Sequence, residues 1–284
     1  MLRKGDSIGL VACSNGRDLE KARDITHLEE LLLDYFSLKC VRASTIFKAE
    51  NERINRNASK RAEELMKLYQ NPEIKAIFDI SGGDVANEVL PYLDFGVIRK
   101  ANKPFIGYSD LTVVLNAIWA QAGVMGHNYQ VLHLTGSESE LQLEQFKKVF
   151  LKGENLIFPY EILRKKAKMH GEVIGGNIRC LLKLSGTRYL PDSKGRTILL
   201  EAMSGDRNKI STYFAQLDQM GYIERANGII LGTFSEMEKL GQRQEVDEIA
   251  QMYAERHDKF LLKTAIVGHN DNAWPFPLGK MLEF

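Results

Sequence analysis

Short apolar runs alternate with amphipathic segments along the first half of the chain, and this order constrains the fold most. Strands are expected at residues 8–12, 39–43, 76–80 and 104–106, and helices at 19–36, 58–69, 85–90 and 111–122. Because the strand runs are continuously apolar rather than alternating, both faces of their sheet should be buried under helices. The first half therefore predicts a doubly wound α/β domain with a parallel sheet.

The second half predicts another, smaller α/β domain. A helix at 138–150 should end the first domain, and a polar, basic stretch follows it. Shorter strands are expected near 171–174, 197–200, 228–231 and 262–267, with helices near 178–184, 210–220 and 246–256. We therefore predict an N-terminal domain over 1–152, a linker over 153–169, and a C-terminal domain over 170–284 with a mixed, barrel-like sheet.

Charge and cysteine content favour a small-molecule partner. The 284 residues include 38 Lys and Arg against 37 Asp and Glu, so no overall field would attract nucleic acid or an anionic membrane. No apolar stretch is long enough to span a bilayer or resembles a signal peptide, so we expect a cytoplasmic protein. Cys13, Cys40 and Cys180 lack the spacing of a disulfide framework or zinc site, and no metal or cofactor is expected.

The segment Gly107-Tyr108-Ser109-Asp110 lies between an expected strand and an expected helix. A serine on such a sharp turn projects its hydroxyl out of the sheet, as a nucleophile requires. The backbone N–H of Asp110 would then point at the oxygen of an attacked carbonyl. A serine in this place is more often only a helix N-cap, so the turn alone leaves both readings open.

An acid and a histidine follow later in the chain, in settings typical of sites. Glu201 follows an expected strand directly, and His269 follows another, after Gly268, which allows a tight approach. The order serine, acid, histidine is that of α/β-hydrolases, although Leu111 replaces the last glycine of their elbow. Each residue also has a simpler reading, as a structural histidine or an exposed strand-end carboxylate.

Two glycine pairs precede expected helices. Gly82-Gly83 lacks the further residues of a Rossmann or P-loop motif, so an oxyanion or substrate-binding role suits it better than nucleotide binding. Gly175-Gly176-Asn177 reads as a turn with an N-cap or as part of the substrate site. Of the remaining histidines, His127 and His133 are ambiguous, and His127 is the one considered for the cleft lining.

Taken together, these segments resemble the LD-carboxypeptidase family of serine peptidases, which includes the microcin C7 self-immunity proteins. The likeness covers nearly the whole chain and is carried by Lys4-Gly5-Asp6-Ser7-Ile8-Gly9, Ser81-Gly82-Gly83, Leu90-Pro91-Tyr92-Leu93-Asp94-Phe95, Lys103-Pro104-Phe105-Ile106-Gly107-Tyr108-Ser109-Asp110-Leu111-Thr112, Gly175-Gly176-Asn177, Leu199-Leu200-Glu201, Gly268-His269 and Pro277-Leu278-Gly279. Each piece is short, but their joint order is specific.

The resemblance implies a catalytic triad of Ser109, Glu201 and His269, with the serine on the N-terminal domain and the other two on the C-terminal domain. We expect Asp110 and Gly83 as oxyanion donors, and Gly82 and Asn177 as further substrate contacts. Family members called LD-carboxypeptidases remove the terminal D-alanine from murein tetrapeptides, and dimers are common among them. The sequence thus predicts a cofactor-free, homodimeric serine carboxypeptidase.

Two other functions remain open. Immunity proteins of this family cleave an aminoacyl linkage to a modified nucleotide, and Ser81 stands where many murein-recycling members have an arginine. Trp274 or Phe276 would be placed to stack on a base, although packing is the more usual role of such residues. The third possibility is a small-molecule binding protein that kept the crevice without the chemistry.

Overall fold

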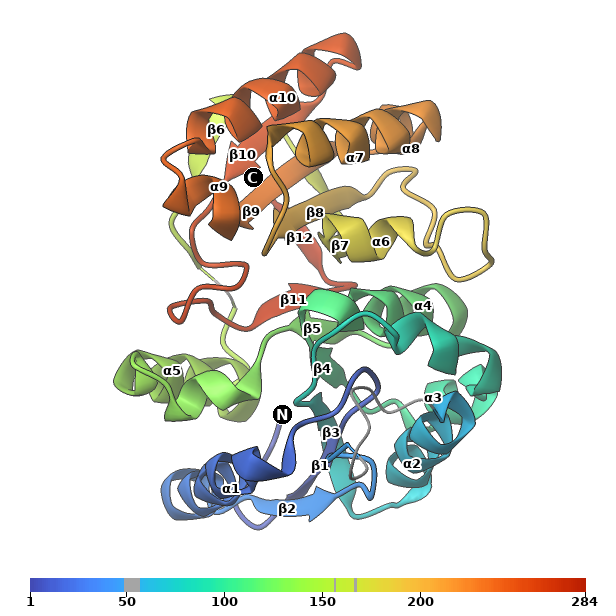
Figure 1. Ribbon diagram of the computed structural model, residues 1–284, viewed down its shortest axis with the longest axis vertical. Helices are drawn as coiled ribbons and strands as arrows, with labels where there is room; N and C mark the ends of the chain where they lie inside the picture. Colours follow the sequence, from blue (N-terminus) through green and yellow to red (C-terminus); the bar gives the residue numbers. More distant parts are fainter. Residues whose placement is uncertain (49–56, 156, 166–167) are drawn as a thin grey trace.

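The computed structural model describes residues 1–48, 57–155, 157–165 and 168–284. Two α/β units are stacked along the long axis of the molecule, and each is built on a six-stranded sheet (Figure 1). This confirms the predicted α/β class with two sheets. Within the described residues, no helix is both long and apolar enough to cross a membrane.

The N-terminal sheet has the strand order β11-β5-β4-β3-β1-β2. Its parallel strands are β1 (Ser7–Val11), β2 (Lys39–Arg42), β3 (Ile74–Asp79), β4 (Phe105–Gly107) and β5 (Gly126–Asn128). The edge strand β11 (Phe276–Leu278) comes from near the end of the sequence and pairs antiparallel with β5. The sheet is therefore mixed, whereas the sequence predicted a parallel one.

Helices cover this sheet between its strands. They are α1 (Ala22–Phe36), α2 (Ala58–Gln70), α3 (Phe95–Ala101), α4 (Thr112–Ala122) and α5 (Ser139–Phe146), with the 3-10 turns η1 (Leu19–Lys21), η2 (Ala86–Tyr92), η3 (Ser109–Leu111) and η4 (Val131–Thr135) and the π turn η5 (Lys147–Leu151). The segment predicted as a helix at 85–90 is a 3-10 turn that includes Pro91, because a proline cannot donate the backbone bond that an α-helix needs.

The C-terminal sheet has the order β12-β7-β8-β9-β10-β6. Its four central strands are parallel and its two edge strands antiparallel, in agreement with the predicted mixed sheet. The strands are β6 (Glu161–Arg164), β7 (His170–Asn177), β8 (Thr197–Ala202), β9 (Gly228–Phe234), β10 (Phe260–Lys263) and β12 (Met281–Glu283), and the helices are α6 (Ile178–Leu182), α7 (Arg207–Gln219), α8 (Tyr222–Arg225), α9 (Ser235–Lys239) and α10 (Arg243–Arg256).

Some segments differ from the sequence prediction. The strand expected at 262–267 ends at Lys263, so the residues before His269 form a loop. Strand β6 lies inside the stretch predicted as a linker, and residues 166–167 of that stretch lie outside the described residues. The same holds for residues 49–56 of the polar stretch predicted before α2.

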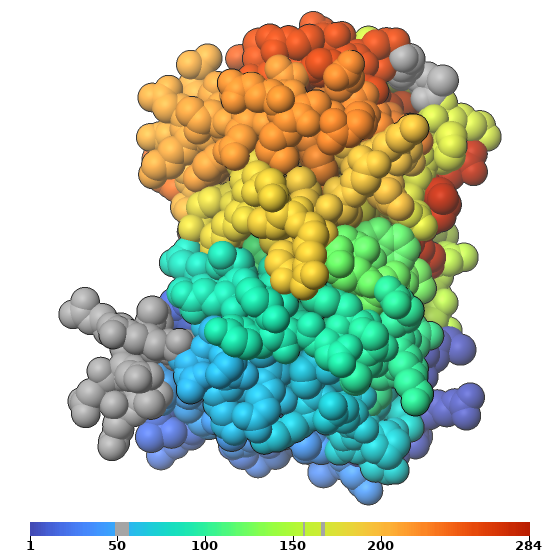
Figure 2. Space-filling model, turned by 90° about the vertical axis from the view of Figure 1, so that its right-hand side faces the viewer, coloured from blue at the N-terminus to red at the C-terminus, as the bar shows by residue number. Residues whose placement is uncertain are grey.

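The two units meet closely along α4 and the end of β7. The side chain of Asn116 accepts a hydrogen bond from the Gly175 N–H and donates one to the Gly175 carbonyl, both at 2.9 Å. A Cβ at Gly176 would lie 2.8 Å from the Thr112 hydroxyl. Figure 2 shows the yellow segment that includes α6 seated on the teal and green part of the N-terminal unit. Glycines therefore let the second sheet approach the helix that follows Ser109.

Candidate active site

Ser109 lies on a strained turn between β4 and α4. Its φ of +56° is in the left-handed region, which residues with a side chain rarely adopt. The residue is partly exposed, while Asp110 beside it is fully buried. Within the described chain, its hydroxyl caps neither η3 nor α4. The N-cap reading is therefore wrong, and the turn has the shape of a nucleophile elbow.

Gly107 explains how this elbow tolerates Leu111. A Cβ at Gly107 would lie 2.9 Å from the Leu111 Cβ, closer than two such atoms come. In the usual elbow both of these positions are glycine, so no side chains meet there. Here the first glycine alone makes room, so the departure at Leu111 leaves the turn intact.

His269 and Glu201 are in direct contact. The imidazole Nδ1 and the carboxylate Oε2 are 2.7 Å apart, and their side chains are only 6% and 1% exposed. Burial alone would lower the pKa of His269, but the charge of Glu201 and its hydrogen bond raise that pKa above its usual value. The pair is thus a histidine held in one orientation by a buried acid.

Local backbone geometry explains how the pair forms. Glu201 is the penultimate residue of β8, where the pairing with β9 shifts register between Leu200 and Ala202. Gly268 has a φ of +144°, and a Cβ there would lie 1.8 Å from the Thr233 Oγ1. Glycine at this position therefore lets the histidine loop pack on β9, as the sequence predicted.

The imidazole also lies beside the nucleophile turn. The rings of Tyr108 and His269 have centroids 4.9 Å apart, and Tyr108 directly precedes Ser109. The buried His269 Nε2 has no hydrogen-bond partner among the described residues. Contacts between a serine and its base are often loose before substrate binds. This nitrogen is therefore the one that would accept a hydrogen bond from a serine hydroxyl.

The Gly82-Gly83 pair forms the neighbouring loop. Gly83 has a φ of +136°, and a Cβ there would lie 2.2 Å from the Asn15 Cγ. The backbone N–H of Asn15 donates to the Gly82 carbonyl at 3.2 Å, and its side chain accepts from the Asp84 N–H at 3.2 Å. The loop after β1 therefore packs tightly against the loop after β3.

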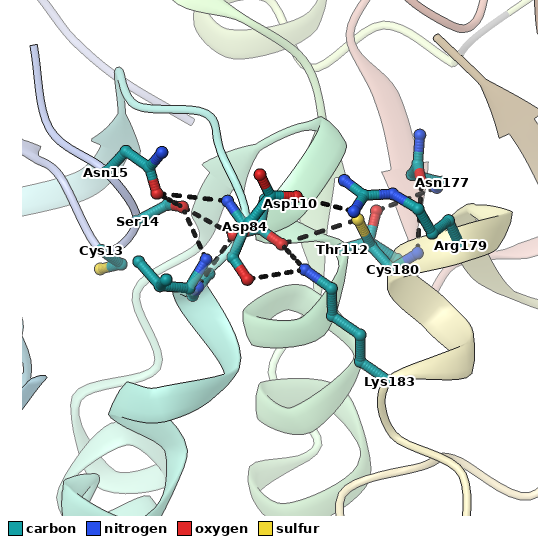
Figure 3. Close-up of polar contacts among 12 residues, drawn as sticks. Cys13, Ser14, Asn15, Asp84, Asp110, Thr112, Asn177, Arg179, Cys180 and Lys183 are labelled. Carbon is teal, nitrogen blue, oxygen red and sulfur yellow. Dashed lines mark hydrogen bonds and ion pairs between the residues drawn. The ribbon is translucent and has the colours of Figure 1, made fainter. Parts of the chain in front are cut away.

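The side chain of Asp110 holds several loops together (Figure 3). It accepts hydrogen bonds from the Ser14 hydroxyl at 2.6 Å and the Ala86 N–H at 2.8 Å. Its other oxygen is 2.5 Å from the ammonium of Lys183, the residue that directly follows α6 in the C-terminal unit. Sequence reasoning considered only the backbone of Asp110 and missed Lys183, which belongs to no recognisable motif.

Asn177 and Ser81 are both occupied by other contacts. The Asn177 carbonyl oxygen accepts from the Cys180 N–H at 3.2 Å, so this side chain is the N-cap of α6. The Ser81 hydroxyl donates to Asp79 at 2.6 Å and is fully buried. Burial raises the pKa of that aspartate to about 6. The Ser81 side chain therefore faces the interior.

The remaining candidate side chains divide between core and site. His127 is half-buried, packs at a steep angle against the ring of Phe150 and lines a pocket with Val149 and Pro277, and burial lowers its pKa to about 4. His133 lies nearer, with its ring 6.1 Å from that of Tyr108. Phe276 is fully buried against Phe158, and Trp274 lines a surface pocket beside α5. No group of potential metal ligands occurs among the described residues.

A serine on a strained strand-to-helix turn, with a buried histidine–carboxylate pair beside it, defines the class of serine hydrolases. Family models agree with this class. The model of the LD-carboxypeptidase N-terminal domain matches residues 8–129, and that of the C-terminal domain matches residues 170–284. The chain belongs to the LD-carboxypeptidase family and is a serine peptidase, not a binding protein that lacks the chemistry.

Individual relatives extend this comparison. The chain is 26% identical to a probable murein peptide carboxypeptidase of Bacillus subtilis (strain 168), over 98% of this chain and 88% of the relative. It has the fold of an MccF-like protein from Bacillus anthracis str. Ames, with a TM-score of 0.85 and 22% identity over 99% and 94% of the two chains. The microcin C7 self-immunity protein MccF in complex with aspartyl sulfamoyl adenosine has a TM-score of 0.83 and 22% identity, over 99% and 93%.

Proposed function

We propose that this serine peptidase is an LD-carboxypeptidase that releases the terminal D-alanine of murein tetrapeptides through Ser109, His269 and Glu201. The observation that carries the proposal is the 2.7 Å contact between His269 and Glu201, beside the turn that presents Ser109. Similarity to a murein peptide carboxypeptidase over nearly the whole chain supports the substrate class.

In the first half of the reaction, the Ser109 hydroxyl oxygen attacks the carbonyl carbon of the scissile amide. His269 Nε2 takes the hydroxyl proton, and Glu201 keeps the imidazole in the tautomer that can accept it. The backbone N–H groups of Asp110 and Gly83 receive the oxyanion. The carbon–nitrogen bond then breaks, His269 returns the proton to the leaving amine, and D-alanine departs from an acyl-enzyme.

Water completes the second half. His269 takes a proton from water, the hydroxide attacks the ester carbonyl, and the same N–H groups bind the second oxyanion. Collapse releases the tripeptide acid and returns the proton to Ser109. Gly82 and Asn177 line the approach in this proposal, through their backbone groups and the amide of the N-cap.

The test is mass spectrometry of murein tetrapeptide incubated with the parent protein and with Ser109→Ala. The parent should release D-alanine and leave a tripeptide. The variant should fold normally, because it loses one oxygen that makes no hydrogen bond within the described residues, but its turnover should fall by at least about 10³-fold. Ser44→Ala, at an exposed serine, is the matched control. A Ser109→Ala protein as active as the parent would disprove the assignment.

A second candidate is hydrolysis of an aminoacyl nucleotide, which the fold similarity to MccF bound to aspartyl sulfamoyl adenosine favours. The same triad would serve, and only the pocket would differ. The buried packing of Phe276 gives no support to base stacking by that residue. Incubation with aspartyl sulfamoyl adenosine separates the candidates, since release of aspartate without tetrapeptide cleavage would replace the murein assignment.

We also propose that the protein works in the cytoplasm as a homodimer. Both ideas derive from the family resemblance, since murein fragments are recycled inside the cell and dimers are common among relatives. Light scattering after size-exclusion chromatography should give twice the 32.2 kDa mass of one chain. A monomer mass at micromolar concentration would contradict the dimer.

A further inference from the structure

Two cations, one on α6 and one just after it, lie near the proposed oxyanion site, but acids of the protein already neutralise them (Figure 3). The Arg179 guanidinium is 2.7 Å from the Asp84 carboxylate. The Lys183 ammonium is 2.5 Å from Asp110 and also donates to the Asp84 carbonyl at 2.9 Å. A negatively charged substrate group would have to compete with these internal partners.

Arg17, in the loop after β1, differs from these two cations in its charge partners. Among the residues that the structure describes, no acid forms an ion pair with it, and its neighbour Asp18 pairs with Lys48 at 2.9 Å instead. The Arg17 Nε is shielded from solvent and has no hydrogen-bond partner within the same residues. A covered donor without an acceptor is unfavourable, and an arriving anion would relieve that cost.

The backbone of Arg17 is held firmly in place. Its N–H donates to the Ile46 carbonyl at 2.7 Å, and its carbonyl accepts from the Lys48 N–H at 2.9 Å. Two residues earlier, Asn15 packs on Gly83, so the loop that carries Arg17 borders the proposed oxyanion loop. A fixed backbone lowers the entropy that a guanidinium loses when it binds a ligand.

The charge of Arg17 also acts on Tyr108, the residue before the proposed nucleophile. Burial and the charge of Glu201 raise the pKa of the Tyr108 hydroxyl, and the charge of Arg17 opposes them. The ring of Tyr108 is tilted against that of His269, and Tyr108 directly precedes Ser109. Arg17 therefore lies two residues from Asn15, which packs on the proposed oxyanion loop, and its charge acts on Tyr108 of the nucleophile turn.

We propose that Arg17 binds the C-terminal carboxylate of the peptide substrate. The inference rests on the proposed carboxypeptidase function and deepens it, because an enzyme that removes one terminal residue must recognise the chain end. A guanidinium binds a carboxylate with two parallel hydrogen bonds, which also fixes its orientation. Ser81 cannot take this role, since its hydroxyl is buried against Asp79.

The experiment compares a murein tetrapeptide with a free C-terminal carboxylate and the same peptide with a C-terminal amide. The parent should prefer the acid. Arg17→Gln should lower kcat/KM for the acid by about 10- to 100-fold, the range for loss of a charge-assisted hydrogen bond, and leave the amide nearly unchanged. Arg17→Lys should keep part of the preference, and Arg23→Gln, at an exposed arginine of α1, is the matched control.

The outcomes distinguish the two claims. A parent that cleaves neither peptide refutes the proposed function, and the assignment of Arg17 falls with it. A parent that cleaves the acid while Arg17→Gln keeps the full preference for acid over amide overturns the role of Arg17 alone. Equal losses on both peptides would also overturn it, because a structural defect does not distinguish carboxylate from amide. Thermal melting and reaction with a serine-directed probe show whether each variant is folded.

Discussion

Replacement of Lys183 by methionine should destabilise the protein through Asp110, the residue after the proposed nucleophile. The Asp110 carboxylate is fully buried and depends on Lys183 as its partner of opposite charge, at 2.5 Å. In Lys183→Met, the carboxylate keeps its neutral donors, which come from Ser14, Ala86 and the Cys180 thiol. The change also removes the hydrogen bond from Lys183 to the Asp84 carbonyl.

The size of the effect follows from burial. Removal of one partner from a buried ion pair costs about 3–5 kcal/mol, because the other charge stays uncompensated. Since the Lys183 side chain is 19% exposed, we expect the lower end, about 3 kcal/mol. For a chain of this size that corresponds to a fall in Tm of roughly 6–10 °C. The kcat should fall as well, since Asp110 holds the loops around the nucleophile turn.

Thermal melting and a double-mutant cycle test this reasoning. Asp110→Asn combined with Lys183→Met should recover part of the stability that Lys183→Met loses, because no buried charge remains unpaired. Lys239→Met, at an exposed lysine of α9, is the control for loss of a surface charge. A Lys183→Met protein within about 0.5 kcal/mol of the parent, with no coupling to Asp110, would refute the argument.

Two further predictions concern the histidine and its loop. Because neutral His269 is the proposed base and Glu201 raises its pKa, the acid limb of kcat/KM should lie above the ordinary imidazole value of 6.5. In Glu201→Gln the charge that raises the pKa of His269 is gone and burial still lowers it, so the acid limb should move to lower pH. Rates measured from pH 5 to 9 test this, and a limb that does not move would contradict it. Gly268→Ala should lower Tm more than Gly186→Ala. Both glycines have a positive φ, but the new methyl group would clash with the Thr233 Oγ1 at position 268 and would meet no atom at position 186. Equal melting temperatures would contradict this steric account.

Local pattern predicted most of the fold. Helix α2 and most core strands of both sheets, β10 excepted, lie close to their expected positions, because each carries enough apolar residues to be recognised alone. Strand β11 has three residues, and it is a strand only because β5 offers a free edge to it. Such a partnership between distant segments leaves no periodic signal in the sequence.

The site divides in the same way. Ser109, Glu201 and His269 lie at strand ends and loops that sequence reasoning can recognise, and the structure brings the last two into contact. The ion pair between Asp110 and Lys183 joins the two units, and its two residues are 73 positions apart in the sequence. A lysine that follows a short helix carries no mark of such a partner, so only the packing of α6 against the nucleophile turn reveals it.

Reaction with a fluorophosphonate probe, followed by peptide mapping, tests the central claim most directly. The account predicts a single adduct on the peptide that contains Ser109, absent from Ser109→Ala and formed far more slowly by His269→Ala and Glu201→Gln. An adduct on another serine, or labelling of Ser109 at the parent rate without His269, would contradict the claim that these three side chains act in series.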